Sequence, residues 1–340
     1  MLKQNNRAKE TREDIEVLNN MRGILTFLTY IIFGLIAANC INVGYYNKYV
    51  FAQGLQHAVI NAPPKDDVQK AEEDAANAPN TYDKYAPAST LKRETLEHDL
   101  KHLKTVTYKQ AIDAQRFLTT DGDIVYLEGL YVPDTQDNDV NTMAFLNEHF
   151  KDKEIDLYVC KERGCKQNDR LGDIRAHGVT QKDHIWIQGL LLRSGFAQMR
   201  TRKDWPYLID AMYEAEKIGQ SDKSGLWSTD GFSILDAKTI TDTHRGYSIV
   251  EGRVYSVAMV DNKVYLNFAD NWRKDFTIVV PSDVRRDYSK YGVDIMGSGG
   301  KKLRVRGWVD YYNGPTIEID HMQQIEWVNG EDNKDIENNK

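Results

Sequence analysis

The longest apolar pattern in the chain is an uncharged stretch near the N-terminus. No residue from Gly23 to Asn47 is charged, and Ile, Leu, Phe and Ala dominate between Ile24 and Ala38. A bilayer core requires about 20 mostly apolar residues, so this stretch is long enough to span one. It is preceded by 22 residues, whereas the charged leader of a signal peptide is normally short. We therefore expect an uncleaved transmembrane helix at residues 23–47, with a cleaved signal peptide as the alternative.

Basic residues are unevenly distributed on the two sides of this stretch. Five precede it: Lys3, Arg7, Lys9, Arg12 and Arg22. In residues 48–63 only Lys48 is basic. Because the flank richer in Lys and Arg stays in the cytoplasm, we expect residues 1–22 to be cytoplasmic. The bulk of this single-pass membrane protein should then lie on the periplasmic, or equivalent non-cytoplasmic, side.

Residues 48–104 connect this stretch to the rest of the chain. Prolines and a polar, alanine-rich run between residues 63 and 87 predict a linker. Leucines then recur at helical spacing between Ser89 and Lys104, at Leu96, Leu100 and Leu103. This spacing predicts a lead-in helix before the globular part.

Two regions with regular apolar patterns follow, at residues 105–230 and 245–328. The first mixes strand-like and helical segments: strands at Asp123–Leu127 and Ile155–Cys160, and helices at Val140–Phe150, Ile185–Ser194 and Leu208–Ile218. The second is almost all strand-like, with a helix at Ser282–Tyr291: strands at Ser248–Val257, Lys263–Phe268, Phe276–Val280, Leu303–Val309, Thr316–Ile319 and Gln324–Val328. Five or six strands and one helix in about 80 residues suit a small closed barrel of the OB type. The polar and acidic composition of residues 329–340 predicts a disordered tail.

Composition narrows the class of protein. The 340 residues are 41% hydrophobic and 28% charged, with a mean hydropathy of -0.59, which excludes a polytopic membrane protein and a wholly disordered chain. The net charge of -7 argues against a globally basic nucleic-acid binder. Three cysteines are too few for a disulfide scaffold.

Several blocks of residues 105–230 resemble the staphylococcal-nuclease-like (thermonuclease) family. The block Ile-Val-Tyr-Leu-Glu-Gly-Leu-Tyr-Val-Pro-Asp at 124–134 is similar to that family's V-R-L-x-G-I-D-A-P-E signature. Further similar blocks follow the family's order and spacing: 112–117, 168–173, 187–197 and 224–228. The resemblance implies a five-stranded OB barrel with three helices. The second region resembles OB-type domains that follow nuclease-like domains, through Lys302–Val309, Asn313–His321 and Gln324–Glu326. We therefore expect a mainly β protein with helices: two OB-type five-stranded barrels in tandem after a single transmembrane helix.

Members of the nuclease family cleave phosphodiesters with calcium, two arginines and a glutamate. Transferred position by position, the resemblance implies a degenerate site in this chain. The two metal aspartates fall on Gln115 and Tyr131, and the two arginines on Tyr126 and Asp173. The general-base glutamate falls on Asp134, which the simplest interpretation makes a turn carboxylate after Pro133. We therefore expect no confident catalytic residue, no resident metal and no cofactor, with calcium relevant only if nuclease activity survives.

Two cysteines, Cys160 and Cys165, flank a Lys-Glu-Arg-Gly turn. Two strands joined by this turn would bring the thiols together, and an oxidising compartment favours a disulfide. Free thiols are the first alternative. A metal site with His177 and His184 is the second, although the spacing is unlike that of zinc fingers.

The second region also contains candidates for contact with nucleic acid or a partner: Trp272, Arg273, Lys274, Arg304, Arg306, Trp308, Tyr311 and Tyr312. Aromatic and basic side chains on a barrel suit stacking and phosphate contacts. The simpler interpretation is that Arg304 and Arg306 form a solvated strand face while Trp308 packs. Residues 231–328 contain 13 basic and 13 acidic residues, so the region is neutral.

These observations favour a membrane-anchored, non-catalytic module that binds other membrane-associated proteins. Two alternatives remain open. One is a membrane-bound phosphodiesterase that uses Asp134 with Arg170 or Arg175, and the other is a single-strand nucleic-acid-binding barrel. Nucleic acid is the less favoured partner because residues 106–230 contain 16 basic and 21 acidic residues, a net charge of -5.

Overall fold

The computed structural model describes residues 81–133, 136–229, 232–241, 244–271, 273–311 and 313–328. All of them belong to one compact unit that begins at Pro79. The described chain is mainly β with helices, as the sequence predicted. Its buried apolar residues form two clusters, one within residues 85–215 and the other within residues 237–327. Each cluster is the core of one region.

The first region contains seven strands, two longer helices and several short helical segments. In chain order they are α4 (Thr81–Tyr85), η1 (Pro87–Ser89), α5 (Arg93–Asp99), β1 (Leu100–Asp113), β2 (Arg116–Thr119), β3 (Ile124–Leu127), β4 (Leu130–Tyr131), α6 (Gln136–Phe150), β5 (Glu154–Cys160), β6 (Ile174–Thr180), α7 (Ile187–Arg193), β7 (Gln198–Met199), α8 (Ile209–Ser221) and η2 (Gly225–Ser228).

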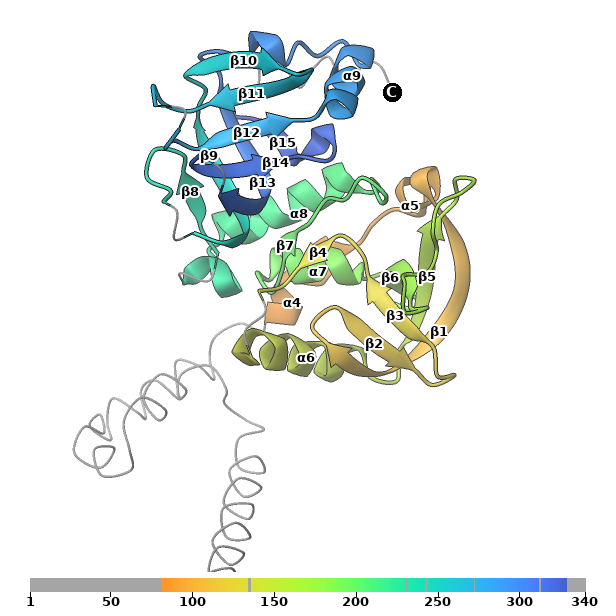
Figure 1. Cartoon of the computed structure of the whole chain (residues 1–340). Helices are drawn as coiled ribbons and strands as arrows, with labels where there is room; N and C mark the ends of the chain where they lie inside the picture. The colour runs from red at the N-terminus through yellow and green to blue at the C-terminus, as the bar shows by residue number, and fades with distance from the viewer. Residues whose placement is uncertain are drawn as a thin grey trace, which may run out of the picture. The chain divides into compact units, whose positions relative to one another are not determined.

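Five of these strands form a closed barrel in the order β1-β2-β3-β6-β5 (Figure 1). Strand β1 closes it by pairing with both β2 and β5, and β3 pairs with β6 in parallel. Every residue of α7 from Ile187 to Leu192 is buried, which explains the continuous apolar run there. The short β4–β7 ladder lies outside the barrel and pairs Tyr131 with Gln198.

The expected lead-in helix at Ser89–Lys104 is only partly correct. Helix α5 ends at Asp99, and the chain continues directly into β1 at Leu100. The first rung of the β1–β5 ladder joins Leu100 to Cys160. Long-range pairing with β5 therefore overrides the helical spacing of the leucines, as tertiary context often does. Leu103, expected on the apolar face of the helix, is 39% exposed on β1.

The second region contains eight strands and one longer helix. In chain order they are β8 (Ile234–Asp236), β9 (Gly246–Arg253), β10 (Ser256–Val260), β11 (Lys263–Asn267), β12 (Thr277–Val280), α9 (Ser282–Lys290), η3 (Met296–Ser298), β13 (Lys302–Tyr311), β14 (Pro315–Glu318), η4 (Met322–Gln324) and β15 (Ile325–Trp327). The sheet runs β10-β11-β12-β14-β13-β9-β8, and β15 also pairs with β13.

This sheet has more strands than the five expected, and a change of partner explains part of the excess. The predicted strand Ser248–Val257 is divided into β9, which pairs with β13, and β10, which pairs with β11. The division falls at Val254, which bonds to Lys301, and Tyr255, which bonds to Asn267. Because β9 and β10 are consecutive in the chain, they are two parts of one extended segment. The order of strands in the sheet begins at β10 and comes back to β9, the other part of that segment. Strand β8, which pairs with β9, and strand β15, which pairs with β13, account for the other additional strands.

Hydrogen bonds join the two regions along one seam. The Tyr247 hydroxyl donates to the Met199 carbonyl at 3.0 Å, and the Tyr213 hydroxyl of α8 donates to the Gln323 carbonyl at 2.6 Å. Arg306 of β13 also donates to the Met199 carbonyl, at 3.1 Å. We call this boundary between β4, β7 and α8 on one side and β9 and β13 on the other the seam.

Among the residues that the structure describes, no helix is long and apolar enough to cross a membrane. The transmembrane helix expected at 23–47, the linker up to residue 80 and the tail at 329–340 lie outside these residues.

Candidate functional site

The described positions that the resemblance assigns to catalysis lie in the turn between β1 and β2, on β3, at the end of β4 and just before β6. The first metal position, Gln115, closes this turn. Its backbone N–H donates to Asp113 Oδ1 at 2.8 Å, and its Nε2 donates to the Leu130 carbonyl at 2.6 Å. The same Nε2 lies 3.5 Å from the Tyr126 hydroxyl. Gln115 thus ties the turn to β4 through its amide.

Tyr126 occupies the first arginine position, on β3. It lies opposite Arg116 of β2, whose guanidinium is 5.5 Å from the centroid of the phenol ring. Burial raises the pKa of the phenol, and the negative charge of Glu128 adds to this, while Arg200, Arg202 and Arg116 oppose it. Tyr126 is therefore neutral at ordinary pH. It offers no positive charge to a phosphate.

The cation directly opposite Tyr126 in the sheet is already neutralised. Arg116 Nε lies 3.2 Å from Asp173 Oδ2, and its Nη1 donates to Asp113 Oδ2 at 3.2 Å. Burial raises the pKa of Asp173, and the neighbouring Asp169 raises it further, while Arg116 lowers it. Asp173, at the second arginine position, therefore removes positive charge from the place where the family's nucleases need it.

Tyr131, at the second metal position, lies in the seam. Its ring centroid is 4.8 Å from that of Tyr247 and 5.8 Å from that of Trp308, both in the second region. Asp134 lies outside the described residues. Within the described part of the chain, no group of three or more His, Cys, Asp or Glu side chains could hold a metal ion. Gln115 and Tyr131, the residues at the calcium positions, offer a neutral amide and a phenol in place of carboxylates, so the negative charge that favours binding of this hard cation is missing there.

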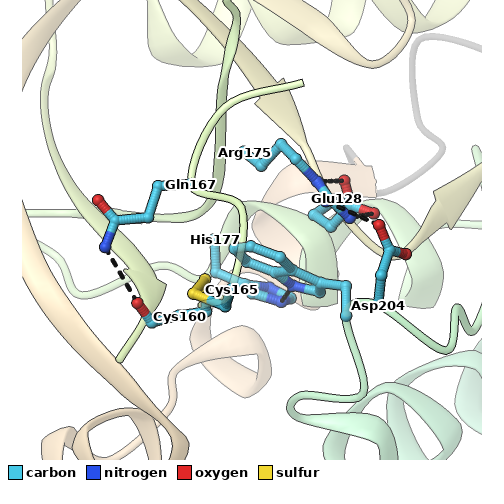
Figure 2. The surroundings of a disulfide bond; sticks show 8 residues. Glu128, Cys160, Cys165, Gln167, Arg175, His177 and Asp204 are labelled. Atoms are coloured by element: carbon cyan, nitrogen blue, oxygen red, sulfur yellow. Dashed lines mark hydrogen bonds and ion pairs between the residues drawn. A yellow bond between two sulfur atoms is a disulfide. The ribbon is translucent and has the colours of Figure 1, made fainter. Parts of the chain in front are cut away.

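A buried ion network that sequence reasoning did not identify lies next to these positions (Figure 2). Arg175 of β6 binds Glu128 through two hydrogen bonds of 3.1 Å and Asp204 through one of 2.9 Å. Glu128 is fully buried, and Arg202 lies 3.5 Å from it. Burial raises the pKa of Asp204, but hydrogen bonds from Arg202 and Arg175 outweigh it and lower the pKa to about 2. Two arginines and two carboxylates therefore neutralise one another.

The sequence signal for this network was weak. Arg175 was considered only as a partner of Asp134 in the phosphodiesterase alternative, and Glu128 belongs to the block at 124–134 that carries the resemblance. The guanidinium of Arg175 also stacks 4.9 Å from the Trp205 ring. Its partners come from the turn after β3 and from the loop before α8, far apart in the sequence. The network holds these elements together and leaves none of its charges uncompensated.

Cys160 and Cys165 form a disulfide, with Cα atoms 6.3 Å apart (Figure 2). Gln167 Nε2 donates to the Cys160 carbonyl at 3.3 Å, and the Gln167 carbonyl accepts from Arg175 N–H at 2.8 Å. The disulfide and these bonds hold the loop that leads into β6. They place the disulfide beside the buried ion network.

His177, considered above as a metal ligand, is a core residue. It is fully buried on β6, and its Nδ1 accepts a hydrogen bond from Trp186 Nε1 at 3.2 Å. Trp205 Nε1 lies 3.5 Å from its other ring nitrogen. Burial lowers the pKa of His177 to about 3. Since indole N–H groups only donate, a protonated ring would face two donors, and the imidazole stays neutral.

On β13 the structure reverses the simpler interpretation: Arg306, expected on a solvated face, is buried, and Trp308, expected in the core, is exposed. Arg306 is 1% exposed and pairs with Glu216 and Glu326, each at 2.9 Å. Arg304 binds Glu251 through two hydrogen bonds, the shorter 2.6 Å. Trp308, expected to pack, is 53% exposed. Helix α8 covers this face of the strand at Arg306, so the arginine is buried and the indole beyond the helix is not.

The remaining candidates lie near the loops at one end of the second region. Tyr311 is 43% exposed, and the Arg245 guanidinium lies 5.4 Å from its ring centroid. Arg273 and Lys274 are exposed in the loop between β11 and β12. Trp272 and Tyr312 lie outside the described residues. The structure thus brings Trp308 together with Tyr131, one of the degenerate positions, and removes Arg304 and Arg306 from the candidates for external contact.

Comparison with known proteins does not extend this picture. No family model matches the chain, and no curated protein sequence matches it. The functional conclusion therefore depends on the geometry described above and on the sequence blocks.

Proposed function

We propose that this chain is a membrane-anchored, non-catalytic module built from two OB-type barrels, the first of them nuclease-like, that binds other proteins in a membrane-associated complex. The observation that carries the proposal is which residues occupy the positions that the resemblance assigns to catalysis. Gln115 and Tyr126 fill two of its positions, and the neighbouring Arg116 is neutralised by Asp113 and Asp173.

Strand order supports the assignment of both regions to the OB type. In each region a three-strand meander is followed by a helix and two further strands. The last strand pairs in parallel with the third, as β6 does with β3 and β14 with β12. The fourth strand then pairs with the last strand and with the first, as β5 and β13 do. Two regions with one topology suit a tandem of related barrels.

The size of the expected loss in rate supports the absence of phosphodiesterase activity. Removing one preorganised donor to a transition-state oxyanion costs about 3 kcal/mol, a factor of about a hundred to a thousand in rate. The chain replaces both arginines and both metal carboxylates of the family pattern, and Asp173 adds a negative charge near the phosphate position. Arg116, Arg175 and Arg202 do not compensate for these losses, because all three face carboxylates. Arg200 also acts on Tyr126, but it stacks on Trp308 and is a single charge in place of two arginines and two metal carboxylates.

A nuclease assay on the purified full-length chain in detergent tests this proposal. Single-stranded DNA and RNA are incubated with the protein in millimolar calcium, and cleavage is followed on gels. We expect no cleavage above that of a buffer control. Cleavage that requires calcium and disappears in Asp134→Ala would refute the proposal, because Asp134 is the one acidic residue at a catalytic position of the resemblance that retains its charge type.

Membrane attachment and location form part of the same proposal. They depend on the apolar stretch at 23–47 and on the basic residues before it. The Cys160–Cys165 disulfide supports a non-cytoplasmic location, because cytosolic thiols are kept reduced. Protease treatment of membrane vesicles tests the orientation. Digestion of the barrels in intact vesicles that expose their cytoplasmic face would contradict it.

A further inference from the structure

An indole ring is held in a fixed position on the seam but left half in solvent. Trp308 lies near the end of β13, with its ring centroid 5.8 Å from Tyr131 and 5.9 Å from Tyr247. Interplanar angles of 82° and 71° make both contacts edge-to-face. The Tyr247 hydroxyl is itself fixed by the Met199 carbonyl. An aromatic group ordered in this way loses little conformational entropy when it binds.

A guanidinium lies beside this indole. Arg200 follows β7, its backbone N–H bonds to the Gly129 carbonyl, and its guanidinium is 5.6 Å from the centroid of the Trp308 ring. Among the described residues, no carboxylate pairs with Arg200. Other arginines of the seam and of the neighbouring network face carboxylates: Arg116, Arg175, Arg202, Arg304 and Arg306. Arg200 is thus the cation there that remains available to a ligand.

Tyr311 lies three residues after Trp308 on β13, so its side chain points to the opposite face of the strand and is not part of this surface. This side chain is 43% exposed, and the Arg245 guanidinium stacks 5.4 Å from its ring. We call Tyr131, Arg200, Tyr247 and Trp308, which contact one another, the seam platform. Trp, Tyr and Arg are the residues most enriched among those that dominate the energy of protein interfaces. The platform therefore has the composition of a protein-docking site rather than of a solvated strand.

We propose that the seam platform docks a short acidic peptide segment of a partner protein, with an aromatic or apolar side chain against Trp308 and a carboxylate paired with Arg200. This inference rests on the proposed function as a binding module, and it adds the surface and the chemistry of the partner.

Charge favours an acidic peptide over nucleic acid at this surface. Affinity for nucleic acid increases with the number of phosphates that free cations neutralise. Most arginines near the platform are already neutralised by buried or neighbouring carboxylates, and the first region carries a net charge of -5, with 16 basic and 21 acidic residues in 106–230. A peptide with one or a few carboxylates needs one free guanidinium, whereas a polyanion would meet long-range repulsion.

Fluorescence anisotropy with the purified full-length chain tests the proposal. The probes are a labelled Gly-Ser dodecapeptide that contains two Glu and two Tyr (the Glu-Tyr peptide), one with the two Glu but no Tyr, one with two Lys in place of the two Glu, and an oligothymidylate with the same charge as the acidic peptides. The variants are Trp308→Ala, Arg200→Ala and Trp308→Phe. Matched controls are Tyr255→Ala and Arg286→Ala, which replace an aromatic residue that is 60% exposed and an exposed arginine, both outside the platform.

We expect the Glu-Tyr peptide to bind most tightly of the four. Trp308→Ala should weaken its binding about tenfold or more, and Arg200→Ala about threefold to tenfold, whereas Trp308→Phe should restore most of the loss. The control variants should bind as the unaltered chain does. Melting curves that match the unaltered chain show that each variant is folded.

Three results would overturn the inference: no binding of the Glu-Tyr peptide, binding that the platform variants leave unchanged, or tighter binding of the oligothymidylate that depends on Trp308. The third would identify the surface as a nucleic-acid site. None of the three bears on catalysis. Calcium-dependent cleavage of DNA or RNA would refute the proposed function without showing what the platform binds, so the two failures are distinguishable.

Discussion

Replacing Arg306 by Met would remove a buried positive charge from the seam between the two regions. The side chains of Arg306 and Glu216 are each 1% exposed, and their closest atoms are 2.9 Å apart. Glu326 Oε1 lies 2.9 Å from the same nitrogen, and the guanidinium stacks 4.5 Å from the Tyr213 ring. Arg306→Met therefore leaves the carboxylate of Glu216 in a site that water does not reach, with the backbone N–H of Met199 as its remaining bond from β7.

Arg304 on the same strand provides the matched comparison. Its ion pair with Glu251 is more accessible, with side chains 21% and 18% exposed, and Lys302 also pairs with Glu251. Breaking a buried ion pair by removing one partner typically costs about 3 to 5 kcal/mol. A partly exposed pair contributes about 1 kcal/mol or less. We therefore expect Arg306→Met to lower the free energy of unfolding by about 3 kcal/mol or more, and Arg304→Met by about 1 kcal/mol.

Urea unfolding of the full-length chain, followed by tryptophan fluorescence, measures both changes. The double variant Arg306→Met, Glu216→Gln should recover part of the loss, because an uncharged amide replaces the stranded carboxylate. The reasoning would be refuted if Arg306→Met cost no more than Arg304→Met. It would also be refuted if the double variant were less stable than Arg306→Met alone.

Three further predictions concern the first region. Because burial lowers the pKa of His177 to about 3, the unfolded chain binds a proton below pH 6.5 that the folded chain does not. Stability should therefore fall by up to about 1.4 kcal/mol per pH unit below pH 6.5, and His177→Phe should show a shallower decline in urea unfolding at several pH values. Breaking the Cys160–Cys165 disulfide by substituting both residues with Ser should lower the free energy of unfolding by about 2 kcal/mol, because the bond closes a short loop in the unfolded chain. Gly195 has a φ of +70°, and a Cβ there would overlap the Ser224 carbonyl oxygen, so Gly195→Ala should cost about 2 kcal/mol or more in the same assay.

Each of these predictions has a result that would contradict it. Identical slopes of stability against pH for His177→Phe and the unaltered chain would mean that His177 titrates equally in the folded and unfolded states. A serine variant as stable as the oxidised chain would show that the loop is ordered without the disulfide. For Gly195, Gly122→Ala is the control, because Gly122 also has a positive φ, of +92°, but open space around it.

Local patterns in the sequence predicted most of the regular elements. The helix expected at Ser282–Tyr291 corresponds to α9, Ser282–Lys290, and the strand expected at Lys263–Phe268 corresponds to β11, Lys263–Asn267. These segments are correctly predicted because their periodicity reflects which side of a single element is buried. The prediction was wrong at Leu100, where a partner strand 60 residues away determines the backbone.

The candidate site divides in the same way. The mismatch with the nuclease family's catalytic set could be inferred from residue types alone, because an amide or a phenol cannot supply the charge of a carboxylate or an arginine wherever it lies. The network of Glu128, Arg175 and Asp204 could not be inferred. Its members come from three separate segments, and no spacing along the chain shows that they meet.

By itself, the sequence determined which chemical groups this protein has: the apolar stretch at 23–47, the residue types at the positions that the resemblance assigns to catalysis, and the approximate places of strands and helices. Only the tertiary structure decided which of those groups water can reach. Arg306 and Trp308 are two residues apart on one face of one strand, yet the arginine is buried and the indole is exposed. The reason is that α8, from a distant part of the chain, covers one position and stops short of the next. Burial depends on what packs against a strand, and the strand's own sequence does not encode its neighbour.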